Sequence, residues 1–148
     1  MKKVADPQMH SAEHILNQTM VRMFNKGRSF SAHIEKKKSK CDYKNFDRAL
    51  TEEEHAEIEK RVNEVIARNL PVSEVFLPRE EAGKKFNLER LPEEVGDEVR
   101  IIKIGDYDEC PCSGVHVKNT NEIGRFKVVS SGFENGIMRL RFKLEEGE

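Results

Sequence analysis

The chain has 148 residues, with hydrophobic and charged residues at 36% each and a formal net charge of −1. This length fits one domain spanning residues 1–148 that can bury a sizeable core. No apolar run approaches the roughly 18–20 residues of a membrane span, and residues 1–7 lack the apolar stretch of a secretory signal. We therefore expect a cytoplasmic protein with no membrane partner.

The first predicted elements are a helix and a hairpin. Asp6 is the expected N-cap of a helix with Pro7 at its first position, and the Asn-Lys-Gly sequence at 25–27 is expected to end it. Alternating residues in 29–34 and 39–43 predict two strands around a run of lysines.

The second helix has the clearest signals. Thr51 caps it, Glu54 completes a capping box, and Pro71 ends a stripe of apolar residues at helical spacing. Beyond it we expect a strand over 72–77, a short helix from 78 to about 86, a strand over 99–104, and a closing hairpin formed by 126–130 and 137–144. The fold class is α+β, a single domain with a largely antiparallel sheet packed with two main helices.

Two pairs of potential metal ligands lie at opposite ends of the chain. His10 and His14 leave the same face of the first helix one turn apart, and Cys112 and His116 have the same spacing in a later loop. Zinc accepts such a set of three imidazoles and one thiolate. Four protein ligands are typical of a structural zinc, whereas three ligands leave a position for catalytic water, and the spacing leaves both open. Cys110 is a further possible ligand.

The first helix also matches the H-x-x-E-H pattern of inverted zinc peptidases, in which Glu13 would be the general base. Those peptidases are far larger and take a downstream glutamate as third ligand. We prefer a solvated helix face for Glu13, with a catalytic role beside the metal as the weaker alternative.

Residues 112–127, C-S-G-V-H-V-K-N-T-N-E-I-G-R-F-K, resemble the C-G-G-T-H-V-x-x-T-x-E-I-G-x-F-K stretch of alanyl-tRNA synthetase editing domains. The helix that carries His10 and His14 resembles the H-x-x-x-H helix of the same domains. The chain thus resembles the free-standing AlaX proteins of short type, which are related to the second additional domain of threonyl- and alanyl-tRNA synthetases.

The resemblance implies a trans-editing hydrolase that uses zinc to cleave the ester of mischarged tRNA, with serine or glycine on tRNA(Ala) as the expected substrate. The resemblance implies that the zinc ligands are His10, His14, Cys112 and His116. Candidate substrate-binding residues are Ser29, Ser31, His33 and Gly114, and candidate RNA-binding residues are Lys36, Lys37, Lys38 and Lys40. The alternative is a non-catalytic, zinc-stabilised tRNA-binding module.

The loop departs from the family pattern at Ser113 and Val115, where the family has glycine and threonine. Loss of the threonine hydroxyl puts recognition of serine in question. The sequence predicts no oligomeric state.

Overall fold

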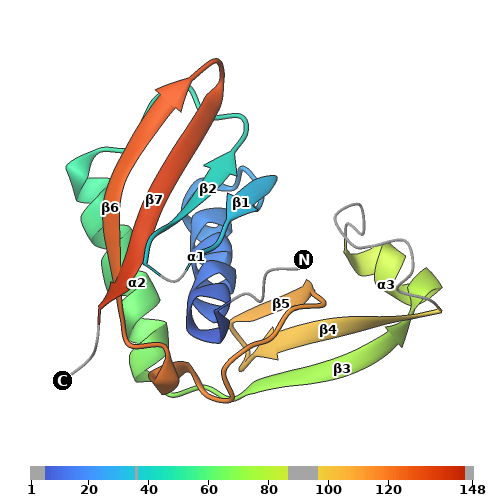
Figure 1. The fold of residues 1–148 in the computed structure, drawn as a ribbon. Helices are drawn as coiled ribbons and strands as arrows, with labels where there is room; N and C mark the ends of the chain where they lie inside the picture. Colours follow the sequence, from blue (N-terminus) through green and yellow to red (C-terminus); the bar gives the residue numbers. More distant parts are fainter. Residues whose placement is uncertain (1–5, 36, 87–96, 146–148) are drawn as a thin grey trace.

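The computed structural model describes residues 6–35, 37–86 and 97–145 and shows an α+β fold (Figure 1). In chain order the elements are α1 (Pro7–Phe24), β1 (Ser31–His33), β2 (Ser39–Tyr43), α2 (Glu52–Ala67), β3 (Val72–Pro78), α3 (Arg79–Lys85), β4 (Glu98–Ile104), β5 (Asp108–Pro111), the 3-10 helix η2 (Thr120–Glu122), β6 (Arg125–Glu134) and β7 (Ile137–Glu145). The predicted fold class is confirmed. Within these described ranges, no helix is both long and apolar enough to span a membrane.

The strands form two antiparallel sheets rather than one. The order is β1-β2-β7-β6 in the four-stranded sheet and β3-β4-β5 in the three-stranded sheet. In the larger sheet β2 pairs with β7, with Cys41 opposite Leu140, so the early hairpin and the closing hairpin share one sheet. In the smaller sheet β5 is an edge strand that ends at Pro111. The chain then enters the loop that leads to β6.

Both main helices begin as their capping residues predict. The Asp6 carboxylate accepts a hydrogen bond from the backbone N–H of Met9 at 3.0 Å, and α1 ends at Asn25 in the left-handed region (φ 56°). At the start of α2, Thr51 and Glu54 form both hydrogen bonds of the capping box. These caps satisfy backbone groups that a helix end otherwise leaves unpaired.

The main core lies where α1 and α2 pack against each other and α2 packs on β6 (Figure 1). The buried side of α2 consists of Ile58, Val62, Val65 and Ile66, the predicted stripe. A second, small cluster of Ala82, Val99 and Ile101 lies between α3 and the three-stranded sheet. Each sheet therefore has its own helical cover.

The loop between β5 and β6 is tied to the end of α2 through η2, which the sequence did not predict. The Thr120 hydroxyl donates to the carbonyls of Val65 and Ile66, both at 3.1 Å, and accepts from the N–H of Leu70 at 2.8 Å. These buried hydrogen bonds hold one end of the loop that carries Cys112 and His116.

Candidate metal centre

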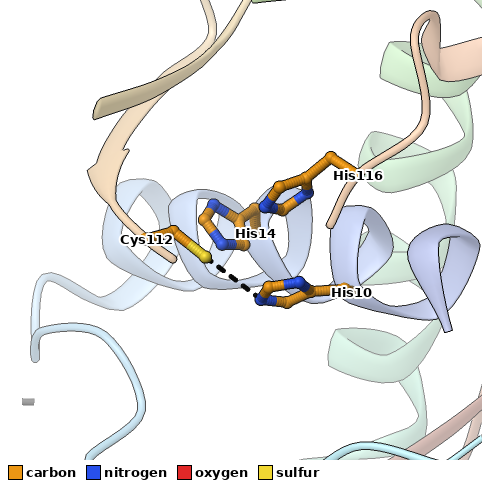
Figure 2. Close-up of side chains that lie close together, drawn as sticks. All are labelled: His10, His14, Cys112 and His116. Atoms are coloured by element: carbon orange, nitrogen blue, oxygen red, sulfur yellow. Dashed lines mark hydrogen bonds between the residues drawn. The ribbon is translucent and has the colours of Figure 1, made fainter. Parts of the chain in front are cut away.

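The first half of α1 presents His10 and His14 on the same side of the helix. His14 is buried and His10 is half-buried. The loop that follows β5 brings Cys112 and His116 to this side of α1 (Figure 2). Two ligand pairs about one hundred residues apart in sequence therefore meet in space.

The four side chains converge closely. Each offers one potential ligand atom, and these atoms all lie within 4.8 Å of one another. The Cys112 Sγ lies 3.3 Å from the Nε2 of His10. The ring of His116 stacks on that of His10, with 4.2 Å between the ring centroids.

Each histidine has an outer partner on its Nδ1 side. The Nδ1 of His10 lies 3.0 Å from the carbonyl oxygen of Val115, and the Nδ1 of His116 lies 2.9 Å from the Ser11 hydroxyl. The Nδ1 of His14 makes no hydrogen bond with the described residues but lies 3.6 Å from the Asp108 carboxylate, within ion-pair distance. Such partners fix the ring orientation and the tautomer of metal-binding histidines, leaving Nε2 for the metal.

Asp108 is itself held firmly. It is buried, and its carboxylate accepts hydrogen bonds from Arg28 at 2.7 and 3.3 Å and from Gln18 at 3.0 Å. Burial opposes ionisation of Asp108, but its contacts with His14 and Arg28 outweigh burial and lower its pKa to about 2. A fixed negative charge therefore lies behind His14.

The charges inside the cluster favour metal binding. Burial alone would raise the pKa of the Cys112 thiol, but its contacts with the three histidines outweigh burial and lower the pKa to about 3. Burial is the main reason that the pKa of His116 falls to about 4. Burial also disfavours the charged form of His14, yet Asp108 and Cys112 raise its pKa to about 9. The thiolate and the neutral imidazole are ready ligands, whereas His14 must release a proton when a metal binds.

The residues present fit a metal ion. The Nε2 of His116 is buried and has no hydrogen-bond partner among the described residues. An unpaired buried nitrogen costs free energy unless another group satisfies it. Three imidazoles and one thiolate form a donor set that binds borderline-soft metals.

The ligand loop is held from outside by Arg100 on β4. Its Nη1 donates to the carbonyl of Cys112 at 3.1 Å and to that of Gly114 at 2.7 Å. Its own carbonyl accepts from the N–H of Cys112 at 3.1 Å, and its Nε donates to Glu74 at 2.8 Å. Arg100 therefore holds the backbone of the loop at Cys112 and Gly114.

Gly114 lies directly against His10. A Cβ added at Gly114 would lie 2.2 Å from the Cε1 and 2.6 Å from the Nδ1 of His10, closer than side-chain atoms can approach. The backbone of the loop can reach α1 at this point only because residue 114 has no side chain.

The cluster opens into a pocket of about 790 Å³. His10, His14, Cys112 and Gly114 belong to its wall, together with residues that follow α1 and β2. A metal ion at the cluster would therefore be reached from the pocket rather than being enclosed on all sides.

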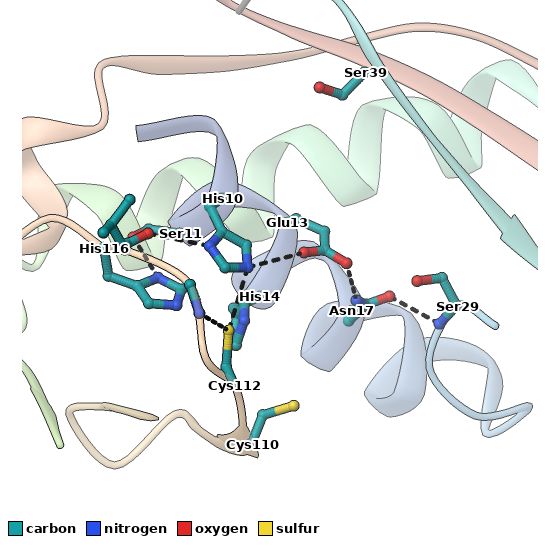
Figure 3. Close-up of polar contacts among 12 residues, drawn as sticks. His10, Ser11, Glu13, His14, Asn17, Ser29, Ser39, Cys110, Cys112 and His116 are labelled. Carbon is teal, nitrogen blue, oxygen red and sulfur yellow. Dashed lines mark hydrogen bonds and ion pairs between the residues drawn. The ribbon is translucent and has the colours of Figure 1, made fainter. Parts of the chain in front are cut away.

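Glu13 also lines this pocket. It lies between His10 and Asn17 (Figure 3). It is 7% exposed, and one carboxylate oxygen lies 3.9 Å from the Nε2 of His10. The other oxygen accepts a hydrogen bond from Asn17 at 3.2 Å, and the Asn17 carbonyl oxygen accepts from the Tyr43 hydroxyl and the Ser29 N–H. The expectation of a solvated helix face for Glu13 is wrong, because α1 turns this residue into the pocket wall.

Only some of the other predicted site residues line the pocket. Ser29 and Gly114 line the pocket, whereas Ser31 and His33 lie on β1 outside its lining, where His33 contacts Glu35. Cys110 also lines the pocket, and burial is the main reason that its pKa rises to about 11.

The predicted RNA-binding lysines that the structure describes do not line the pocket. Lys37 and Lys38 are exposed in the loop between β1 and β2, and Lys40 lies on β2. Lys36 lies outside the described residues. None of the described three belongs to the pocket wall.

Sequence reasoning missed the residues that act through others: Ser11, Asn17, Arg100 and Asp108. The partners of Ser11, Arg100 and Asp108 lie far along the chain, and no local spacing indicates them. Asn17 and its partner Glu13 have the i, i+4 spacing at which side chains meet on a helix, and this signal was overlooked. The position of Ser11 beside His10 on the apolar side of the helix was another available signal, since a serine buried in a helix must find a partner.

A known protein family matches the part of the chain that supplies two of the four candidate ligands. The family described as the threonyl and alanyl tRNA synthetase second additional domain matches residues 99–143, which include Cys112 and His116. Alanine–tRNA ligase of Fervidobacterium nodosum is 35% identical over 142 residues, covering 95% of this chain and 16% of that enzyme.

Two further relatives are similar. Alanine–tRNA ligase of Neisseria gonorrhoeae is 34% identical, covering 86% of this chain and 15% of the enzyme, and alanine–tRNA ligase 1 of Lachnoclostridium phytofermentans is 34% identical, covering 94% and 16%. The chain spans about one sixth of the length of these relatives. Residues 99–143 therefore match the threonyl and alanyl tRNA synthetase second additional domain, and most of the chain is similar to one part of the alanine–tRNA ligases.

Proposed function

We propose that this chain is a zinc-dependent hydrolase that removes a wrong amino acid from tRNA, with serine or glycine on tRNA(Ala) as its substrate. The observation that carries the proposal is the cluster of three histidines and Cys112, of which His10, His14 and Cys112 line a pocket, in a relative of alanine–tRNA ligases. A catalytic metal must be accessible to substrate, and this cluster opens to the pocket.

Zinc suits the donor set, and His10, His14, Cys112 and His116 would hold it. A zinc ion at such a site acts as a Lewis acid toward an ester carbonyl and the attacking water.

The protein's own groups supply positioning and proton transfer. In the reaction, the water oxygen bonds to the carbonyl carbon and the bond from this carbon to the ribose oxygen breaks. The proton removed from the water is passed on to the ribose oxygen, and the ribose hydroxyl and the free amino acid leave. We assign Glu13 as the acceptor of the water proton, because its carboxylate is buried, faces the pocket and lies beside His10. Asn17 orients Glu13, since its amide bonds one carboxylate oxygen and leaves the other toward the cluster.

A non-catalytic, zinc-stabilised tRNA-binding module is the second candidate. The observation in its favour is that all four candidate ligands converge, since four protein ligands are typical of structural zinc sites.

The test is release of labelled amino acid from tRNA(Ala) charged with serine, glycine or alanine. We expect fast release of serine or glycine, little release of alanine, and loss of activity in His10→Ala and on treatment with a chelator. His55→Ala is the matched control, because His55 lies on α2 outside the pocket. Release of none of the three amino acids by a zinc-loaded protein would refute the hydrolase and leave the binding module.

Glu13→Gln tests the assigned base. General-base catalysis contributes roughly 10²–10⁴-fold, so kcat should fall by about that factor while zinc content stays unchanged. Glu109→Gln on the exposed part of β5 is the control. A kcat for Glu13→Gln equal to that of the control would remove Glu13 from the reaction.

A further inference from the structure

The pocket has a second end that the proposed chemistry does not use. Besides the cluster, its wall contains residues 26–30, which follow α1, and residues 44–45, which follow β2. Both turns include left-handed backbone, at Gly27 (φ 87°) and Asn45 (φ 69°). Two segments distant in sequence thus border the same opening, and each carries one exposed lysine, Lys26 or Lys44. We call these two lysines the basic rim.

The basic rim has charge available for a ligand. Lys26 Nζ lies 5.6 Å from the centre of the Phe46 ring, and Lys44 Nζ lies 5.5 Å from that of Phe30. Neither lysine forms an ion pair with any of the described residues. A cation over an aromatic ring keeps its full charge and its hydrogen-bond donors.

Arg28, the other cationic side chain that lines the pocket near these lysines, is already paired with a carboxylate. Arg28 donates two hydrogen bonds to Asp108 and is thereby neutralised. The negative side chain of Glu13 lies at the other end, beside the cluster. An elongated ligand with its reacting ester at the cluster and an anionic group toward Lys26 and Lys44 complements this charge distribution.

We propose that the basic rim binds the phosphodiesters of the single-stranded 3′ end of tRNA, with the sugar and base of the terminal nucleotide packed on Phe30. This inference rests on the proposed function, because the ester to be cleaved is attached to that terminal nucleotide. Proteins bind single strands by combining basic groups for the backbone with aromatic faces for the bases. Lys26, Lys44 and Phe30 supply both at the opening of the site.

The proposed RNA-binding residues beside the site, Lys26 and Lys44, differ from those suggested by the lysine run. Lys37 and Lys38 are exposed in the β1–β2 loop and do not line the pocket. They provide a matched control, since neutralising either pair removes two charges from exposed positions.

The experiment compares Lys26→Gln/Lys44→Gln with Lys37→Gln/Lys38→Gln on two substrates, seryl-tRNA(Ala) and seryl-adenosine, which has the ester but no phosphate. We expect the rim variant to raise KM for the charged tRNA about tenfold or more and to change kcat/KM for seryl-adenosine less than twofold. The dependence of log KM on log salt should weaken by about 1.4, since each single-strand phosphate contact contributes about 0.7. The Lys37→Gln/Lys38→Gln variant should change the KM for charged tRNA and its salt dependence less.

A binding measurement separates this inference from the proposed function. Fluorescence anisotropy with a short oligoribonucleotide that has the tRNA 3′ end requires no hydrolysis. Weaker binding by the rim variant, without hydrolysis by the wild type, would support the rim and refute the hydrolase. Hydrolysis of both substrates with the same KM and salt dependence in wild type and rim variant would overturn the rim inference, as would a larger effect of the hairpin pair.

Discussion

Substitution of Gly114 by alanine should disrupt the metal centre while leaving the fold in place. The new Cβ would lie 2.2 Å from the His10 Cε1, whereas ordinary contacts begin at 3.4 Å, so the ring or the loop must move by about 1.2 Å. Metal–ligand distances tolerate only about 0.2 Å. A turn of the His10 ring would also break its contact with the Val115 carbonyl, which lies in the same loop as Gly114.

We expect the zinc affinity of Gly114→Ala to fall by at least the roughly 10–100-fold seen when an outer partner of a metal ligand is removed. The strain on the metal-free protein should stay within the roughly 1–3 kcal/mol typical of overpacking. Competition with a chromogenic zinc chelator measures the affinity, and circular dichroism with thermal melting checks the fold.

Gly132→Ala is the matched control, because its added Cβ would meet only Arg141 Nη1, at 3.9 Å. A folded Gly114→Ala protein that binds zinc as tightly as Gly132→Ala would refute the steric argument and the assignment of His10 as a ligand.

Three further predictions concern the surroundings of the site and the fold. Ser11→Ala should lower zinc affinity about 10–100-fold and destabilise the protein by about 1–3 kcal/mol, because His116 and the N–H of Val117 lose their common partner; chelator competition and urea unfolding measure the two effects. Arg100→Met should weaken zinc binding with little change in helical content, since it frees two carbonyls of the ligand loop; unchanged affinity would count against the clamp. Glu54→Gln should lower the free energy of unfolding by about 0.5–1 kcal/mol at pH 7. The hydrogen bond with Arg48 lowers the pKa of Glu54 from 4.5 to about 2. The difference in the free energy of unfolding between wild type and Glu54→Gln should therefore be complete above pH 4.5 and should vanish as the pH falls toward 2. Denaturant titrations at several pH values measure this difference.

The helices and the closing hairpin could be predicted because their signals are local. Asp6 and Thr51 cap helices through their own nearest backbone groups, and the Asn135-Gly136 turn adopts the left-handed angles (φ 54° and 81°) that its residues favour. The 3-10 helix at Thr120 was missed because its hydrogen bonds are made to α2, more than fifty residues away in sequence.

The sequence by itself determined the ligand chemistry. Helical periodicity places His10 and His14 on one face, and the residue types at Cys112 and His116 define what could be bound. Only the tertiary structure decided that the two pairs meet, that Glu13 turns inward, and that Lys26 and Lys44 border the pocket. The physical reason is that these relations depend on the packing of α1 against a loop about one hundred residues later, and side-chain periodicity carries information only over a few turns or strand residues.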